Sequence, residues 1–266
     1  QRRGLVGSLS ARARRVRAIA ANAWLQAIRQ RSVLVLVPYT IVLSGGALIL
    51  RQISVGQEIK ILKDLALASM DLFGSFAAIV MGVDLVTREI ERKSAYPILA
   101  RPVSRGEFVL GKFLGLVAAL SLNLTLMLVI MALVLSAMGD SMSAPLLGAT
   151  WGILLGLVLT VAVALFFSVI TNSVLASAFS IIVVMGGRFS DVVRNMADVM
   201  PGVPKALPRL LYVALPNFQN FDYKLTSVYG DPIAFDTLVL ATLYCAVYAG
   251  ILLTLAAAAF ERKELV

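Results

Sequence analysis

A series of long apolar runs constrains the fold of this chain more than any other feature. A transmembrane helix needs about 20 largely apolar residues, and six segments come near or exceed that length. These segments are 33–50, 65–86, 110–138, 145–170, 173–193 and 235–259. With 59% apolar residues, the 266-residue chain is too apolar for a soluble domain of its size. We therefore predict an all-α integral membrane protein with six transmembrane helices.

The basic residues between the apolar runs predict the topology. Sixteen Lys and Arg residues lie in segments 1–32, 87–112 and 260–266, against eight in segments 51–64, 139–144 and 188–234. Because cytoplasmic loops carry the excess of Lys and Arg, we place both termini, including the tail 260–266, and the 87–109 loop in the cytoplasm. The net charge of +9 is then expected to face anionic lipid in the bilayer, and no nucleic acid.

The segment 1–32 has the pattern of an amphipathic helix. Its apolar residues recur at helical spacing, while the arginines mostly avoid that face. The apolar set is Val16, Ile19, Ala20, Ala23, Trp24, Ala27 and Ile28, and the arginines are Arg12, Arg14, Arg15 and Arg17. We predict a helix that lies in the inner membrane interface with its arginines near lipid phosphates. The alternative is a disordered basic tail.

The segment 188–234 is expected to form short extracellular helices between spans 5 and 6. Ser190-Asp191 can cap a helix whose apolar stripe includes Met196 and Met200. Further along, the chain is broken repeatedly by Pro201, Pro204, Pro208 and Pro216. Since the segment is long for a simple connection, the pattern favours a cap or gate, with Met196 and Met200 as gate candidates.

The residue inventory argues against catalysis by this chain. The sequence contains no His, and its single cysteine, Cys245, permits neither an internal disulfide nor a site with several thiolates. No paired carboxylates or nucleophile constellation mark an active site within the spans. We therefore expect no catalytic residues and no metal site.

Residues 106–112 come close to a nucleotide-binding motif. Gly106, Gly111 and Lys112 match GxxxxGK, but Phe113 stands where a hydroxyl must meet magnesium. No strand precedes the motif, and a membrane span follows it. We interpret Gly106 as the start of a turn and Lys112 as a side chain that reaches the inner interface.

Polar residues inside the spans are candidates for a pathway, because burying a lone charge costs several kcal/mol. Asp84 can pair with Arg88 four residues later, whereas Asp71 has no such local partner and suits either gating or simple packing. Asn123, Thr125 and Thr160 are expected to line a pathway or to bond between helices. The glycines at 148, 152 and 156 are spaced for close helix contact on the fourth span.

The loop 88–105 is unusual for a connection between two spans. Charged residues flank a short amphipathic unit from Tyr96 to Leu99, and Pro102 ends it. An apolar knob on a short cytoplasmic helix is shaped to enter a groove on another protein.

Residues 89–112, EIERKSAYPILARPVSRGEFVLGK, resemble the loop between the second and third spans of type-2 ABC transporter permeases. The similarity is greatest to the branch that includes the permease of the nitrous-oxide-reductase maturation transporter. Many members carry Gly-Thr or Lys-Thr where this chain has Lys93-Ser94. The overall layout of spans and flanking helices is also similar.

The resemblance implies a permease subunit that forms a dimer with a second copy or a paralogue and sits on two ABC ATPase subunits. The implied ATPase-coupling residues are Glu89, Glu91, Ser94, Tyr96, Leu99, Arg101, Pro102 and Arg105, with 94–101 as a coupling helix. ATP and Mg would be bound by the ATPase, and no cofactor by this chain. The implied location is a bacterial inner membrane, and a periplasmic accessory protein is an optional partner. Two alternatives remain, a subunit that transmits force without moving solute and an ion-coupled secondary transporter using Asp71 or Asp84.

Overall fold

The computed structural model describes residues 2–53, 56–91, 105–190 and 215–262. Within these ranges the chain consists of helices joined by turns and loops, without a strand, which confirms the predicted all-α class. The long helices are α1 (Arg2–Ile53), α2 (Glu58–Glu91), α4 (Arg105–Ala137), α5 (Ala144–Ile170), α6 (Ser173–Arg188) and α10 (Phe235–Arg262). Two short helices, η1 (Phe218–Phe221) and α9 (Lys224–Tyr229), lie between α6 and α10.

The long helices overlap the six apolar runs of the sequence, although not all of them have full membrane-spanning length. Among the described residues, four helices, α2, α4, α5 and α10, are long and apolar enough to cross a bilayer. The apolar parts in α1, Val35–Leu50, and in α6, Ser173–Arg188, are shorter. At 1.5 Å per residue α6 is about 24 Å long, less than the roughly 30 Å hydrocarbon core. Within the described residues, α6 therefore ends at Arg188, directly after Gly186-Gly187, and is shorter than the predicted fifth span, 173–193.

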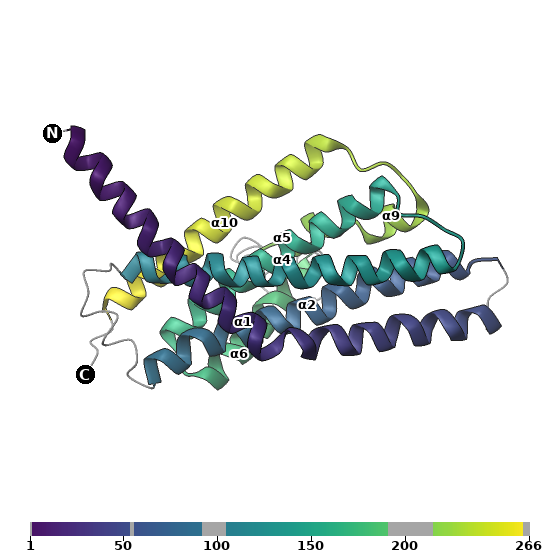
Figure 1. Ribbon diagram of the computed structural model, residues 1–266, viewed down its shortest axis with the longest axis horizontal. Coiled ribbons are helices and arrows are strands. Elements are labelled where there is room, and N and C mark those ends of the chain that lie inside the picture. Colours follow the sequence, from purple (N-terminus) through teal and green to yellow (C-terminus); the bar gives the residue numbers. More distant parts are fainter. Residues whose placement is uncertain (1, 54–55, 92–104, 191–214, 263–266) are drawn as a thin grey trace, which may run out of the picture.

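The predicted interfacial helix and first span form one continuous helix. α1 runs from Arg2 to Ile53 and contains Pro38. In Figure 1 the first part of α1 slants away from the bundle, and the part that ends at Ile53 runs along it. The change of direction within α1 matches the change from an amphipathic to an apolar sequence.

Local sequence signals explain how the chain reverses direction at two tight connections. Gly139 adopts a φ of 84°, a conformation that glycine tolerates best, directly after α4, and Pro145 stands in the first turn of α5. Asn172 caps α6 by accepting a hydrogen bond from the backbone N–H of Leu175 at 3.0 Å. These turns place α4, α5 and α6 side by side.

The centre of the bundle is formed by α2 and α5. In each of their apolar windows 72% of the residues are buried, compared with 33% in α4 and 17% in α10. α4 and α10 therefore expose apolar side chains at the periphery, as expected for helices that face lipid. Figure 1 shows α4 beginning and α10 ending at the same end of the bundle, where the first part of α1 also lies. By the predicted topology this is the cytoplasmic end.

Candidate functional site

Most of the predicted coupling residues lie outside the described residues. These are Ser94, Tyr96, Leu99, Arg101 and Pro102. Glu89 and Glu91 belong to the last turns of α2, and Arg105 is the first residue of α4, but their side chains are likewise outside the described part. In the chain, the predicted coupling loop therefore follows the end of α2 and precedes the start of α4.

The first turns of α4 pack closely against the amphipathic part of α1. A Cβ added at Gly115 would lie 2.5 Å from the carbonyl oxygen of Ala20 and 2.5 Å from Cβ of Ala23. A Cβ added at Gly111 would lie 2.7 Å from Ile19. Because both glycines lack side chains, the two helices approach backbone to backbone. The apolar face predicted for α1 is therefore turned toward α4 at these residues.

An ion pair joins the same two helices. Arg15 Nε and Nη2 donate to the two carboxylate oxygens of Glu107 at 3.0 and 3.1 Å. The Glu107 side chain is 11% exposed, which limits screening by solvent. For Arg15 the sequence pattern thus missed a protein partner, a carboxylate in the first turn of α4, while the proximity of the arginines to lipid phosphates stays a prediction.

The start of α4 also packs against the end of α10. The rings of Phe108 and Phe260 stack with centroids 6.0 Å apart. Lys112 is only 4% exposed and its Nζ lies 5.4 Å from the centroid of the Phe108 ring, so it is buried instead of reaching the interface. Gly106 does not open a separate turn, since α4 already begins at Arg105. The GxxxxGK match therefore lies in a helix whose glycine at 111 serves packing.

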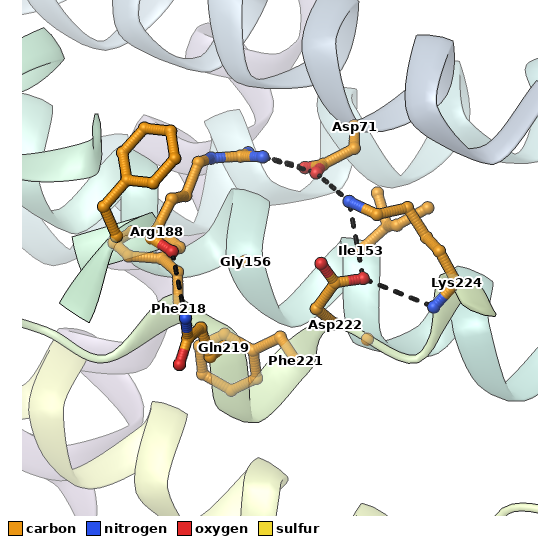
Figure 2. Close-up of a pocket in the computed structure, with 11 residues that line it drawn as sticks. Asp71, Ile153, Gly156, Arg188, Phe218, Gln219, Phe221, Asp222 and Lys224 are labelled. Carbon is orange, nitrogen blue, oxygen red and sulfur yellow. Dashed lines mark hydrogen bonds and ion pairs between the residues drawn. The ribbon is translucent and has the colours of Figure 1, made fainter. Parts of the chain in front are cut away.

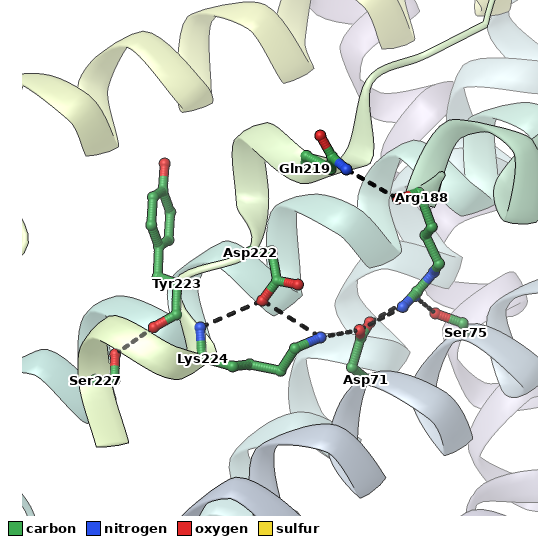
Figure 3. A network of polar contacts seen from close by, with 8 residues as sticks. All are labelled: Asp71, Ser75, Arg188, Gln219, Asp222, Tyr223, Lys224 and Ser227. Carbon is green, nitrogen blue, oxygen red and sulfur yellow. Dashed lines mark hydrogen bonds and ion pairs between the residues drawn. The ribbon is translucent and has the colours of Figure 1, made fainter. Parts of the chain in front are cut away.

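A second polar cluster lies deep in the bundle, at Asp71 on α2. Arg188 Nη2 donates to Asp71 Oδ1 at 2.6 Å and to Ser75 Oγ at 2.7 Å, while its Nη1 donates to Asp71 Oδ2. Lys224 Nζ lies 2.8 Å from the same Oδ2. Figure 3 shows both cations converging on the one carboxylate. We call Asp71, Ser75, Arg188 and Lys224 the Asp71 network.

The Asp71 network connects segments that are distant in sequence. Asp71 is about 20 Å along α2 from Glu58, at 1.5 Å per residue. Arg188 is the last residue of α6, and Lys224 is the first of α9. Lys224 is also 3.5 Å from Asp222 Oδ1, whose side chain is 51% exposed. The segment that precedes α10 therefore reaches into the bundle and is held there by charge.

Backbone outside the long helices needs hydrogen-bond partners where it is buried, because an unpaired N–H or C=O group there is costly. The backbone N–H of Asn217 donates to the Tyr244 hydroxyl at 2.9 Å, and Asn217 Oδ1 accepts from Ser190 Oγ and from the N–H of Gln219. Gln219 Nε2 donates to the carbonyl of Arg188 at 3.4 Å. Side chains thus provide the hydrogen bonds that a helix would otherwise supply.

The glycine stripe of α5 receives this segment, and not another long helix. A Cβ at Gly152 would collide with the carbonyl oxygen of Phe221 and lie 2.8 Å from the ring of Tyr223. At Gly156 the nearest atom, in the Phe218 ring, is 3.9 Å away. We call residues 215–229 the re-entrant segment, since Phe218 and Phe221 are 5% and 4% exposed within the bundle.

The contact between α5 and the re-entrant segment predicts different effects on stability for alanine at Gly152 and at Gly156, which lie one helical turn apart. Gly152→Ala should destabilise the protein by about 1–3 kcal/mol, because the new methyl group displaces the Phe221 backbone. Gly156→Ala is the matched control and should be neutral or slightly stabilising, since alanine favours a helix by about 1 kcal/mol. Thermal unfolding in detergent measures both. Equal melting temperatures for the two variants would contradict this packing.

The remaining predicted pathway residues do not join the Asp71 network. Asn123 is buried, and its Nδ2 donates to the carbonyl of Ala119 in its own helix. Thr125 is exposed and donates to Ser121. Met196 and Met200 lie outside the described residues, as does the side chain of Arg88, the predicted partner of Asp84. Of the predicted candidates that the structure describes, only Asp71 lines the cavity beside the network.

Sequence reasoning missed Arg188 and Lys224 as partners of Asp71. The topology prediction places both among the outer basic residues, and no spacing rule links them to a residue more than 100 positions earlier. One signal was available: the fifth apolar run is broken by Gly186-Gly187 just before Arg188. A charge directly after an interrupted span indicates a buried partner.

A further ion pair, at the predicted outer end, gives a pH-dependent contribution to stability. Lys63 Nζ lies 2.6 Å from Asp140 Oδ2, and the N–H of Ser141 donates to Oδ1. The hydrogen bond from Lys63 holds the pKa of Asp140 below its ordinary value, helped by Ser141 and opposed by burial. A lowered carboxyl pKa stabilises the fold above the unfolded pKa of about 3.9, and this stabilisation is lost as pH falls through the folded pKa.

We therefore expect Asp140→Asn to lower stability by up to about 1 kcal/mol at neutral pH, since the pair is partly exposed. The difference from the unmodified chain should shrink between about pH 5 and pH 2.5. Melting temperatures of both proteins across this range provide the measurement. A difference that stays constant down to the lowest pH would count against the ion pair.

Apolar helices of membrane-spanning length around a re-entrant segment define a multi-pass α-helical membrane protein. The sequence profile of the ABC-2 family transporter proteins matches residues 17–265. The chain therefore belongs to this family, as the resemblance in residues 89–112 implies, and is a membrane subunit of the ABC permease type. A comparison with curated proteins finds no match.

Proposed function

We propose that this chain is the permease subunit through which ABC ATPase subunits drive a conformational change across a bacterial inner membrane. Two ATPase subunits would bind ATP and Mg, and a second copy or a paralogue of this chain would complete the membrane domain. Family membership supports the permease and its pairing with an ATPase. The stoichiometry, the direction of transport and a periplasmic accessory protein are parts of the proposal.

The observation that carries the proposal is the way the start of α4 is held. The predicted coupling helix, 94–101, leads directly into α4. There Glu107 binds Arg15, Gly115 packs on Ala23, and Phe108 stacks on Phe260. Since packed cores shift as units and do not deform continuously, a push on the loop would move α1, α4 and α10 together.

A second candidate function is force transmission to a periplasmic partner without solute movement. The re-entrant segment favours this function, because its Lys224 forms an ion pair with Asp71 on α2. The same helix carries Glu89 and Glu91, predicted ATPase-coupling residues, in its last turns. One helix thus connects the predicted ATPase contact to the outer segment. Reconstituted vesicles that hydrolyse ATP and alter a periplasmic partner, with no solute moved, would favour this function over transport.

The ion-coupled alternative receives less support. It needs a carboxylate that exchanges ions during transport, whereas both oxygens of Asp71 are bound by cations of the protein. Such a transporter would work without ATP and would lose activity in Asp71→Asn.

The test of coupling uses variants of the loop in the complete complex. Leu99→Asp with Arg101→Glu should remove the apolar and basic contacts with the ATPase cleft. We expect ATP hydrolysis to lose its dependence on the permease, or the ATPase to dissociate. The matched control is Asp231→Asn, an exposed residue near the other end of the bundle. Unchanged hydrolysis and association in the double variant would overturn the proposed role of residues 94–101.

A further inference from the structure

A cavity of about 260 Å³ adjoins the Asp71 network. One wall is charged and carries Asp71, Arg188, Lys224 and Asp222, whereas another is formed by phenylalanine side chains, including Phe218. Figure 2 shows the side chains of Arg188 and Lys224 meeting Asp71 at the cavity. The cavity thus combines an ionic end and an apolar wall within the membrane domain.

The charges of this wall are unevenly buried. The side chains of Arg188 and Lys224 are 27% and 19% exposed, and both bind Asp71, which is 11% exposed. The second carboxylate, Asp222, is 51% exposed and lies 3.5 Å from Lys224. Solvent screens its charge more strongly than that of Asp71. Among the described residues of this wall, the largely buried charges are two cations and one anion, so its buried part carries an excess of positive charge.

An excess of positive charge of this origin favours an anion with several acceptor oxygens. Lys224 has three N–H donors, and Arg188 presents a planar fork suited to carboxylate and phosphate groups. Charge-assisted hydrogen bonds from such groups are about twice as strong as neutral ones. A carboxylate or phosphate entering the cavity would share these cations with Asp71.

The rest of the cavity fits an apolar attachment to that anion. Phe218 and Phe221 present aromatic surface, and Gly152 and Gly156 form a wall without side chains. Gly156 lines the cavity, and a Cβ added there would fit in van der Waals contact with the Phe218 ring, at 3.9 Å. A hydrophilic anion alone would leave this apolar surface without a partner.

We propose that the cavity binds a small anionic amphiphile, with its carboxylate or phosphate ester between Lys224 and Arg188 and its apolar part against Phe218. The binding needs only this chain and not the proposed ATPase partner. A negative result here therefore leaves the coupling proposal untouched, and failure of the coupling test leaves this site intact.

The experiment is calorimetric titration of the full chain, purified in a non-ionic detergent, with octanoate. The uncharged analogue 1-octanol is the ligand control. We expect saturable octanoate binding and an affinity for octanol at least about tenfold lower, because octanol cannot form charge-assisted hydrogen bonds. Equal affinity for the two compounds, or no saturable octanoate binding, would overturn the proposal.

Two variants assign the binding to this cavity. Lys224→Gln should reduce octanoate affinity about tenfold or more, and Gly156→Leu should do so by filling the space beside Phe218. Lys60→Gln is the matched control, since Lys60 is exposed and lies over the Tyr229 ring, 5.3 Å from its centroid. If Lys224→Gln is poorly folded, Gly156→Leu alone decides. Unchanged affinity in a folded cavity variant would refute the assignment.

Competition identifies the source of the anion. Octanoate displaced by inorganic phosphate would indicate a soluble anionic ligand. A lipid head group would be indicated if phosphate does not displace octanoate, and if octanoate binding is lost in nanodiscs that contain phosphatidylglycerol but is kept in nanodiscs that contain only phosphatidylcholine. Either result supports the site. Octanoate binding that is insensitive to both competitors would contradict a shared anion site.

Discussion

Asp71→Asn is expected to lower the free energy of unfolding by about 2–4 kcal/mol, one of the two largest effects that the structure implies. The amide has nearly the shape of the carboxylate but carries no charge. Arg188 and Lys224 would then remain largely buried without their shared anion. We place the effect somewhat below the range of about 3–5 kcal/mol for breaking a buried pair, because the two cations retain side-chain exposures of 27% and 19%.

The matched control for this prediction is Asp222→Asn. Asp222 belongs to the same cluster, but its side chain is 51% exposed, so its removal should change stability by less than about 1 kcal/mol. Thermal unfolding of both variants in the same detergent provides the comparison. A double variant, Asp71→Asn with Arg188→Gln, should be less destabilised than the two single effects added together. Similar losses for Asp71→Asn and Asp222→Asn would show that burial does not set the strength of the network.

Gly115→Leu is expected to separate the first part of α1 from α4. The new Cβ would lie 2.5 Å from both the Ala20 carbonyl oxygen and Ala23 Cβ, and backbone cannot yield as a flexible side chain does. We expect a loss of about 3 kcal/mol or more, because overpacking here forces two helices apart. Release of α1 should also make Arg14, Arg15 and Arg17 more accessible to trypsin.

Gly250→Leu is the matched control for this variant. Gly250 lies on an exposed face of α10, with no atom within 4 Å of an added Cβ. The same substitution at this position should leave the melting temperature and the trypsin pattern nearly unchanged. Equal behaviour of the two leucine variants would contradict the close crossing of α1 and α4.

The sequence predicted the helices well because their signal is local. Apolar runs identify α2, α4, α5 and α10 with little error, since each helix satisfies its own backbone hydrogen bonds and is apolar along most of its length, whether it faces lipid or other helices. The sequence also predicts the amphipathic stripe of α1, but it does not show that this stripe packs against α4. Gly111 and Gly115 look like any glycines of an apolar run until the partner helix is known.

The polar cluster escaped prediction because its members come from three separate elements. Asp71 was recognisable as a charge that needs a partner, yet Arg188 and Lys224 follow it by 117 and 153 positions. The extracellular placement expected for the re-entrant segment stays a prediction, and the burial of its aromatic residues Phe218 and Phe221 against α5 has no signal in the sequence pattern. The glycine spacing of α5 predicted close contact correctly but could not distinguish a helix from an irregular segment as its partner.

The most direct test of the central claim is the composition of the complex isolated from its native membrane. The full chain, tagged at its C-terminus, would be purified in mild detergent and examined by native mass spectrometry. We predict an assembly that contains two copies of a Walker-motif ATPase, with two permease chains, and that loses the ATPase when Leu99 and Arg101 are replaced. Isolation of this chain without any ATPase, under conditions that preserve the fold, would contradict the account.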